Sequence, residues 1–211
     1  MGDASESHEE TGALSRLSFE HPMPRAVRRH GRVIDPSGLE AGDLILISSK
    51  KPDWTARQIR SHQEIMFSDE HAKWQHVAIS GGRFEICEAS VTGVTASEYW
   101  KYMTGEYEIK VRRLRNADEA TRNRLAYHAA KSVRRPYGFW TAYGIGRVLK
   151  GGDFWKKSIF KSSGVVCSQL FFEACMREGY LLANIPPENI CPAHLSMSNL
   201  LSDIHPEWVS V

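Results

Sequence analysis

Short apolar runs separated by turn residues dominate the middle of the chain. Residues 44–47 form a continuous apolar run after a Gly-Asp pair, which predicts a buried strand. The segments 76–80 and 84–89 flank a Gly-Gly pair at 81–82, which predicts a β-hairpin. Apolar and charged residues alternate over 107–112, and this alternation predicts a further strand.

Helical spacing is found in three other places. Asp53 is placed to cap a helix that carries Trp54, Ile59 and Met66 on roughly one side. A second helix is expected from residue 116 or 118 to about Val133, before Pro136. A third is expected to run from near Val166 to about Arg177. We expect the tail after Ile190 to cover the domain rather than to build it.

These elements predict an α+β domain with a mostly antiparallel sheet, spanning residues 33–211. Residues 1–32 are predicted to be a flexible or loosely docked N-terminal extension, because they are polar and charged and hold little that could pack. The basic stretch at 25–33 leaves open a binding arm for an anionic partner. Asp43 is expected to have a structural role through hydrogen bonds in its turn, with a role at the edge of the site as the alternative.

Composition excludes several classes of protein. With 42% hydrophobic and 25% charged residues, the chain of 211 residues is an ordinary globular sequence. No apolar run is long enough for a transmembrane helix, and the N-terminal residues lack the apolar core of a signal peptide. We therefore expect a location in the cytoplasm of the producing cell. The net charge of +2 gives no reason to expect a nucleic-acid partner.

Cys167 is the first candidate for chemistry. The expected helix start, with Ser162 or Ser163 as its cap, would direct backbone N–H groups toward the cysteine and favour a thiolate. A thiolate is the nucleophile that acyl transfer requires. By itself, a cysteine at this place is more often a small buried residue.

His76 and Glu88 are the second and third candidates. An imidazole can take a proton from a thiol and later return it to a leaving group. The hairpin brings His76 and Glu88 onto neighbouring strands, where a carboxylate can orient the imidazole. Glu88 shares its parity with Ile86, which predicts an inward direction, whereas Glu85 is expected to face solvent. No cysteine or histidine pair has the spacing of metal ligands, so we expect no metal and no cofactor.

The order and content of these motifs resemble the NlpC-type cysteine peptidase superfamily. The similar segments are 42–46, His76–Gly82 with Glu88, and 166–170 around Cys167. The order His, Glu, Cys resembles the circularly permuted papain-like branch, which includes YiiX-like proteins. The resemblance implies a permuted papain-like fold, with an antiparallel sheet or partial barrel packed against the nucleophile helix.

The resemblance also implies roles for the site residues. Cys167 would be the nucleophile, His76 the general base and acid, and Glu88 the residue that orients His76. Tyr137 resembles a tyrosine found ahead of the nucleophile in this branch. We expect Tyr137, together with Ser168 beside the nucleophile, to bind substrate or the oxyanion. The implied activity is that of a peptidoglycan endopeptidase or amidase acting through a thioester.

Other functions remain open from the sequence alone. Without a signal peptide, such an enzyme could be an antibacterial effector delivered by a secretion system, with an inhibitor (immunity) protein as partner. The aromatic-rich segment 137–161 could instead line an acyl pocket, which would indicate a lipid or protein acyltransferase or a thioesterase. A third alternative is a binding module that retains the fold without catalysis.

Overall fold

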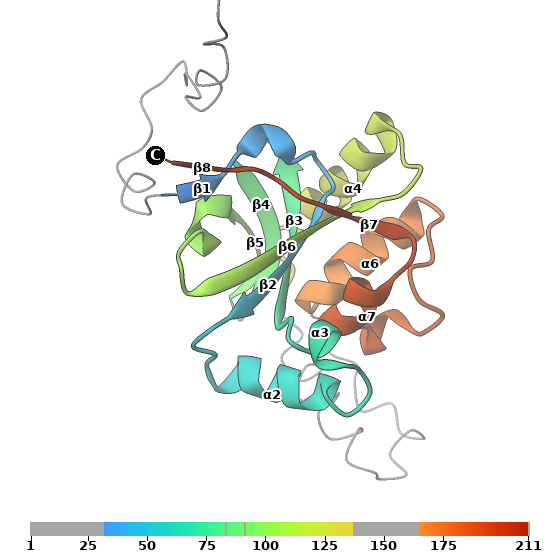
Figure 1. Ribbon diagram of the computed structural model, residues 1–211. Helices are drawn as coiled ribbons and strands as arrows, with labels where there is room; N and C mark the ends of the chain where they lie inside the picture. Colours follow the sequence, from blue (N-terminus) through green and yellow to red (C-terminus); the bar gives the residue numbers. More distant parts are fainter. Residues whose placement is uncertain (1–31, 83, 91, 137–164, 211) are drawn as a thin grey trace, which may run out of the picture.

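A computed structural model of the protein describes residues 32–82, 84–90, 92–136 and 165–210. The predicted extension therefore lies almost wholly outside the described residues. The described part is an α+β structure built on an antiparallel sheet (Figure 1). This outcome confirms the fold class that the hydrophobic pattern predicts.

The main sheet has six strands in the order β5-β4-β3-β2-β6-β7, and every neighbouring pair is antiparallel. Its strands are β2 (Leu44–Ser49), β3 (His76–Gly82), β4 (Glu85–Ser90), β5 (Gly93–Glu98), β6 (Tyr107–Leu114) and β7 (Leu201–Ile204). A separate two-stranded ladder pairs β1 (Arg32–Ile34) with β8 (Trp208–Ser210). The predicted hairpin at 76–89 and the strand at 107–112 are confirmed.

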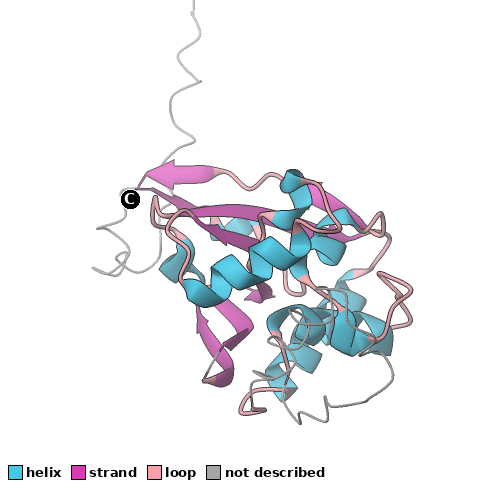
Figure 2. Ribbon diagram, turned by 90° about the horizontal axis from the view of Figure 1, so that it is seen from below, coloured by secondary structure: helices cyan, strands magenta, loops and turns pink. Residues whose placement is uncertain are grey.

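Helices flank the sheet. They are α2 (Trp54–Gln63), α3 (Asp69–Ala72), α4 (Glu119–Lys131), α6 (Cys167–Arg177) and α7 (Pro192–Met197), with short 3-10 turns η1 (Pro36–Gly38), η2 (Tyr99–Tyr102) and η4 (Pro187–Asn189). Helices α4 and α6 pack on each other and on β3 and β4. Figure 2 shows from below that most helical segments lie to one side of the strands.

The two faces of the sheet have separate apolar clusters. On the side of α4 and α6, Leu46 and Ile79 pack with Leu125 and Phe171. On the opposite side, alternate strand residues such as Ile47 pack with residues of β1 and η2. Burying a side chain of this size contributes about 1.5–3 kcal/mol, so the sheet is held from both sides. Strands buried on both faces have continuous apolar runs, which explains the sequence of β2.

Side-chain caps fix the starts of two helices. Asp53 accepts a hydrogen bond from the backbone N–H of Ala56 at 2.7 Å, and Asp118 accepts one from Thr121 at 2.7 Å. Both caps confirm predictions from the sequence, with Asp118 rather than Asn116 at the second helix. The apolar residues assigned to the first helix are not buried, however: Trp54 is 54% exposed and Met66 51%. That helix is instead anchored by Gln63, whose amide donates to the carbonyls of Ala72 and Trp74.

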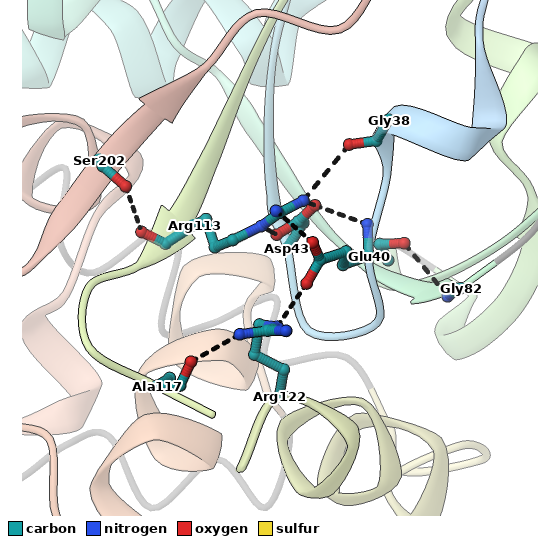
Figure 3. A network of polar contacts seen from close by, with 9 residues as sticks. Gly38, Glu40, Asp43, Gly82, Arg113, Ala117, Arg122 and Ser202 are labelled. Atoms are coloured by element: carbon teal, nitrogen blue, oxygen red, sulfur yellow. Dashed lines mark hydrogen bonds and ion pairs between the residues drawn. The ribbon is translucent and has the colours of Figure 1, made fainter. Parts of the chain in front are cut away.

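A polar network holds the chain ahead of β2 against β6 and α4 (Figure 3). Asp43 is fully buried, and Arg113 donates to both of its carboxylate oxygens at 2.8 Å. Asp43 also accepts the backbone N–H of Glu40 at 2.8 Å, and Glu40 forms ion pairs with Arg113 and Arg122. The structural role expected for Asp43 is therefore confirmed, with a cross-strand arginine that the sequence did not indicate.

The structure differs from the sequence predictions at two elements. The segment after Ile190 does more than cover the domain, because β7 forms the edge of the main sheet beside β6. Strand β5 was not predicted, since its residues lack a clear alternation. Helix α6 has Val166 as its N-cap, whereas Ser162 and Ser163, the expected caps, lie outside the described residues.

Candidate active site

Strands β3 and β4 bring His76 and Glu88 together. In this antiparallel pair Ala78 lies opposite Glu88, and His76 stands two positions before Ala78 on the same face. The side chains are therefore diagonal neighbours, and His76 Nε2 lies 2.7 Å from Glu88 Oε2. A carboxylate that accepts from Nε2 leaves Nδ1 as the ring nitrogen available to another group.

Helix α6 brings Cys167 to the same place. Cys167 is the first residue of the helix, which packs against β3 and β4. A hydrogen bond to the Cys167 side chain is one cause that raises the pKa of His76, so the two residues lie together although they are far apart in the sequence. The three residues predicted from the sequence thus meet in one site.

The electrostatics of the site favour a charged imidazole. Burial alone would lower the pKa of His76, but the hydrogen bond to Cys167 and its charge, followed by those of Glu88, outweigh burial and raise this pKa to about 9. His76 is therefore protonated at neutral pH. An imidazolium beside a cysteine stabilises the thiolate form of that cysteine.

Glu88 is the most heavily bonded carboxylate of the site. Its side chain is only 1% exposed. Four side chains donate to its two oxygens: His76, Ser97, Lys101 and Tyr102. Burial would raise the pKa of Glu88, but the bond and charge of His76, then the bonds of Lys101 and Ser97, hold this pKa far below its usual range. Glu88 is thus a fixed anion.

Three of these donors were missed in the sequence analysis. Ser97 lies on β5, diagonal to Glu88 across the strand pair, and its hydroxyl donates at 2.6 Å. Lys101 and Tyr102 lie on η2, directly after β5. The inward parity of Glu88 was the available indication that such donors must exist, because a buried carboxylate requires partners. The strand that carries them was not predicted, so they could not be placed.

The start of α6 offers backbone donors beside Cys167. The first turn of a helix leaves N–H groups without intrahelical partners, and no side chain in the described part of the chain caps them here. The helix dipole adds positive potential at the same point. The N–H of Cys167 is thus suited to hold a negative oxygen close to the sulfur.

The two residues expected to bind substrate or the oxyanion have different outcomes. Tyr137 lies outside the described residues. Ser168 is 2% exposed, and its hydroxyl donates to the carbonyl of Ile190 at 2.8 Å. This bond ties the start of α6 to the chain ahead of α7. The substrate role of both residues stays a prediction.

A second cysteine–histidine pair lies nearby. The Sγ atom of Cys191 is 3.0 Å from Nδ1 of His194, and Cys191 is close enough to Cys167 to interact with its charge. Burial nevertheless raises the pKa of Cys191 to about 11 and lowers that of His194. Both groups are therefore neutral at physiological pH, and the pair lacks the activated character of the first.

The described residues contain no group of three or more histidine, cysteine or acidic side chains arranged to hold a metal ion. Within the same residues, no helix combines the length and the apolar character needed to cross a membrane. No protein-family model matches the chain, and no curated protein matches it significantly. The arrangement of the site is thus the main guide to its chemistry.

Proposed function

We propose that the protein is a cysteine hydrolase that cleaves an amide bond through a thioester intermediate. One observation carries the proposal: His76 binds the buried carboxylate of Glu88 through Nε2, and a hydrogen bond to the Cys167 side chain contributes to the raised pKa of His76. A nucleophile, a base and an orienting acid in this order are the parts that acyl transfer requires.

The proposed reaction begins with the thiolate of Cys167 and the imidazolium of His76. The sulfur attacks the carbonyl carbon, and the carbonyl oxygen becomes an anion near the N–H of Cys167. The C–N bond then breaks, and the departing nitrogen takes the proton of His76. Neutral His76 next removes a proton from water, whose oxygen attacks the thioester. The C–S bond breaks, and the acid product leaves the thiolate and the imidazolium restored.

For the substrate, we propose a peptide of bacterial peptidoglycan. The support is the resemblance of segments 42–46, 76–88 and 166–170 to NlpC-type cysteine peptidases, together with the order His, Glu, Cys along the chain, which resembles the circularly permuted papain-like branch. We further propose that the enzyme is an antibacterial effector delivered by a secretion system, with an inhibitor protein in the producing cell. Neither proposal requires a metal or a cofactor.

Digestion of purified sacculi tests the substrate. The protein is incubated with sacculi, and the soluble fragments are identified by mass spectrometry. The expected result is new free amino and carboxyl ends at one peptide bond, absent with Cys167→Ala. Cys175→Ala is the matched control, because Cys175 is buried on the same helix and burial raises the pKa of its thiol. Intact sacculi after treatment with folded wild-type protein would refute the peptidoglycan proposal.

A second candidate is a lipid or protein acyltransferase or a thioesterase with the same Cys167–His76 pair. It is favoured by exposed apolar side chains near α7: Ile65 is 56% exposed, Met66 51% and Met197 55%. Phe67 beside them stacks edge-on against His194, at 4.8 Å between ring centroids. Incubation with acyl-lipid donors separates the two candidates, because only the second leaves a fatty acyl adduct on Cys167.

A further inference from the structure

The turn η2 supplies two adjacent side chains to Glu88. Lys101 bonds to Oε1, the oxygen that also accepts from Ser97. Tyr102 donates to Oε2, the oxygen that also accepts from His76. Each carboxylate oxygen therefore has two donors, and the carboxylate cannot turn about its own axis without losing some of them.

Aromatic packing fixes this turn against the site. The ring of Tyr102 lies 5.8 Å from that of His76 and 5.3 Å from that of Tyr107, between centroids. The ammonium of Lys101 lies over the ring of Tyr102, 4.7 Å from its centroid. Lys101 is thus held beside Glu88 while its side chain stays 42% exposed. A surface lysine with an ordinary solubilising role has no such contacts.

We propose that Lys101 is a positioning residue that holds the Glu88 carboxylate and, through it, the ring of His76, and thereby controls the reactivity of Cys167. The inference rests on the proposed function, since it concerns the same site. It goes beyond the three residues that perform the proposed chemistry, because Lys101 bonds to Glu88 alone of those three.

The direction of the effect follows from the charges around His76. Around the site lie Glu88 from β4, Cys167 from α6, Tyr102 from η2, Tyr107 from β6 and Cys191 ahead of α7. Cys87 precedes Glu88 on β4 and points to the other face of the sheet. Cys87, Tyr102 and Cys191 have raised pKa values and stay neutral near pH 7. Lys101 is therefore a second cation, beside His76, on the buried carboxylate of Glu88.

Removal of Lys101 would act on His76 through Glu88. Oε1 of Glu88 would lose one of its two donors, so the carboxylate would hold the ring of His76 less firmly. The imidazolium would also face a less compensated Glu88, so His76 would keep its proton to a higher pH, by about one pH unit or less for a partly exposed charge.

Alkylation of Cys167 by iodoacetamide tests the role of Lys101 and requires no knowledge of the substrate. The rate is measured by peptide mass spectrometry over a pH series for wild type, Lys101→Met, Lys101→Arg and Lys51→Met. Lys51 is the matched control, because it pairs with Glu106 at the surface and is 80% exposed. We expect a rate near pH 6 about two- to tenfold lower for Lys101→Met, because loss of one hydrogen bond to Glu88 leaves His76 less firmly held beside Cys167. Lys101→Arg is expected to restore most of the wild-type profile, and Lys51→Met to match wild type.

The outcomes separate the inference from the proposed function. If Lys101→Met and wild type give the same profile, the role of Lys101 is refuted while the reactive pair stands. If Cys167 of the folded wild type has the same pH profile of alkylation as the same protein unfolded in urea, the proposed thiolate is refuted as well. If circular dichroism shows that Lys101→Met does not fold, Lys101→Gln replaces it, because glutamine keeps a polar group at the partly exposed position. Its alkylation profile is compared with that of the wild type in the same way.

Discussion

His76 and Glu88 are joined by a 2.7 Å bond between Nε2 and Oε2, across two antiparallel strands and diagonal in register. The bond fixes the orientation of the ring and leaves Nδ1 as the nitrogen available to another group. Because Glu88 is buried and held by three further donors, the orientation of His76 depends on a rigid group. The predictions below follow from this arrangement and from the network around Asp43.

Replacement of the nucleophile is the first prediction. Cys167→Ala is expected to reduce hydrolysis at least about a thousandfold, because no other group in the site can form the thioester. The variant should keep the thermal stability of the wild type to within about 1–2 kcal/mol, since a small apolar residue fits a largely buried position. Product formation and thermal unfolding are measured on the same preparation. Hydrolysis retained by the variant would remove Cys167 from the mechanism.

Glu88→Gln is expected to be damaging although it nearly preserves shape. All four partners of Glu88 are donors, and an amide brings two more N–H donors toward them. Stability is expected to fall by about 2–4 kcal/mol and kcat/KM by at least about tenfold. Urea unfolding and steady-state kinetics measure the two effects. Glu85→Gln on the exposed side of the same strand is the control, and equal behaviour of both variants would contradict the role of Glu88.

The pH dependence of stability tests the charge of His76. Its pKa is raised from 6.5 to about 9 in the folded protein, so its contribution is fully present below pH 6.5 and is lost as the pH rises to about 9. The free energy of unfolding is expected to fall over this range by on the order of 2 kcal/mol. Urea unfolding at a series of pH values measures it. A profile of His76→Gln as steep as that of the wild type would show that another group titrates.

Ser168→Ala separates a structural role from a substrate role. Its hydroxyl is bonded to the carbonyl of Ile190, and loss of that bond leaves a buried acceptor unpaired. The expected cost is about 1–3 kcal/mol of stability, with KM unchanged. A raised KM with unchanged stability would support instead the role in substrate binding that the sequence analysis assigns to Ser168.

The network around Asp43 is the basis of a prediction about the stability of the folded protein. Arg113→Met removes both bonds to the fully buried Asp43 carboxylate, and leaving a buried charge without its partner costs about 3–5 kcal/mol. Lys51→Met removes a surface pair with Glu106 and is expected to cost less than about 1 kcal/mol. Thermal and urea unfolding compare the two variants. Similar stability of both would show that the network contributes little.

Local patterns were sufficient for much of the fold. The hairpin at 76–89 and the caps Asp53 and Asp118 depend on residues close in sequence, so their spacing could be interpreted directly. The inward direction of Glu88 followed from its parity with Ile86, and both residues are buried. The exposure of Trp54 on α2 could not be predicted, because helical periodicity does not say whether another element covers that side of the helix.

The sequence by itself determined the antiparallel hairpin with His76 and Glu88 and the helix that carries Cys167, since backbone periodicity and turn residues are local properties. Only the tertiary structure decided that α6 packs on β3, so that Cys167 contacts His76, and that η2 brings Lys101 and Tyr102 to Glu88. Contacts of this kind depend on how the apolar faces of distant elements pack together. No pattern within one segment specifies that packing, because each segment defines only its own buried face.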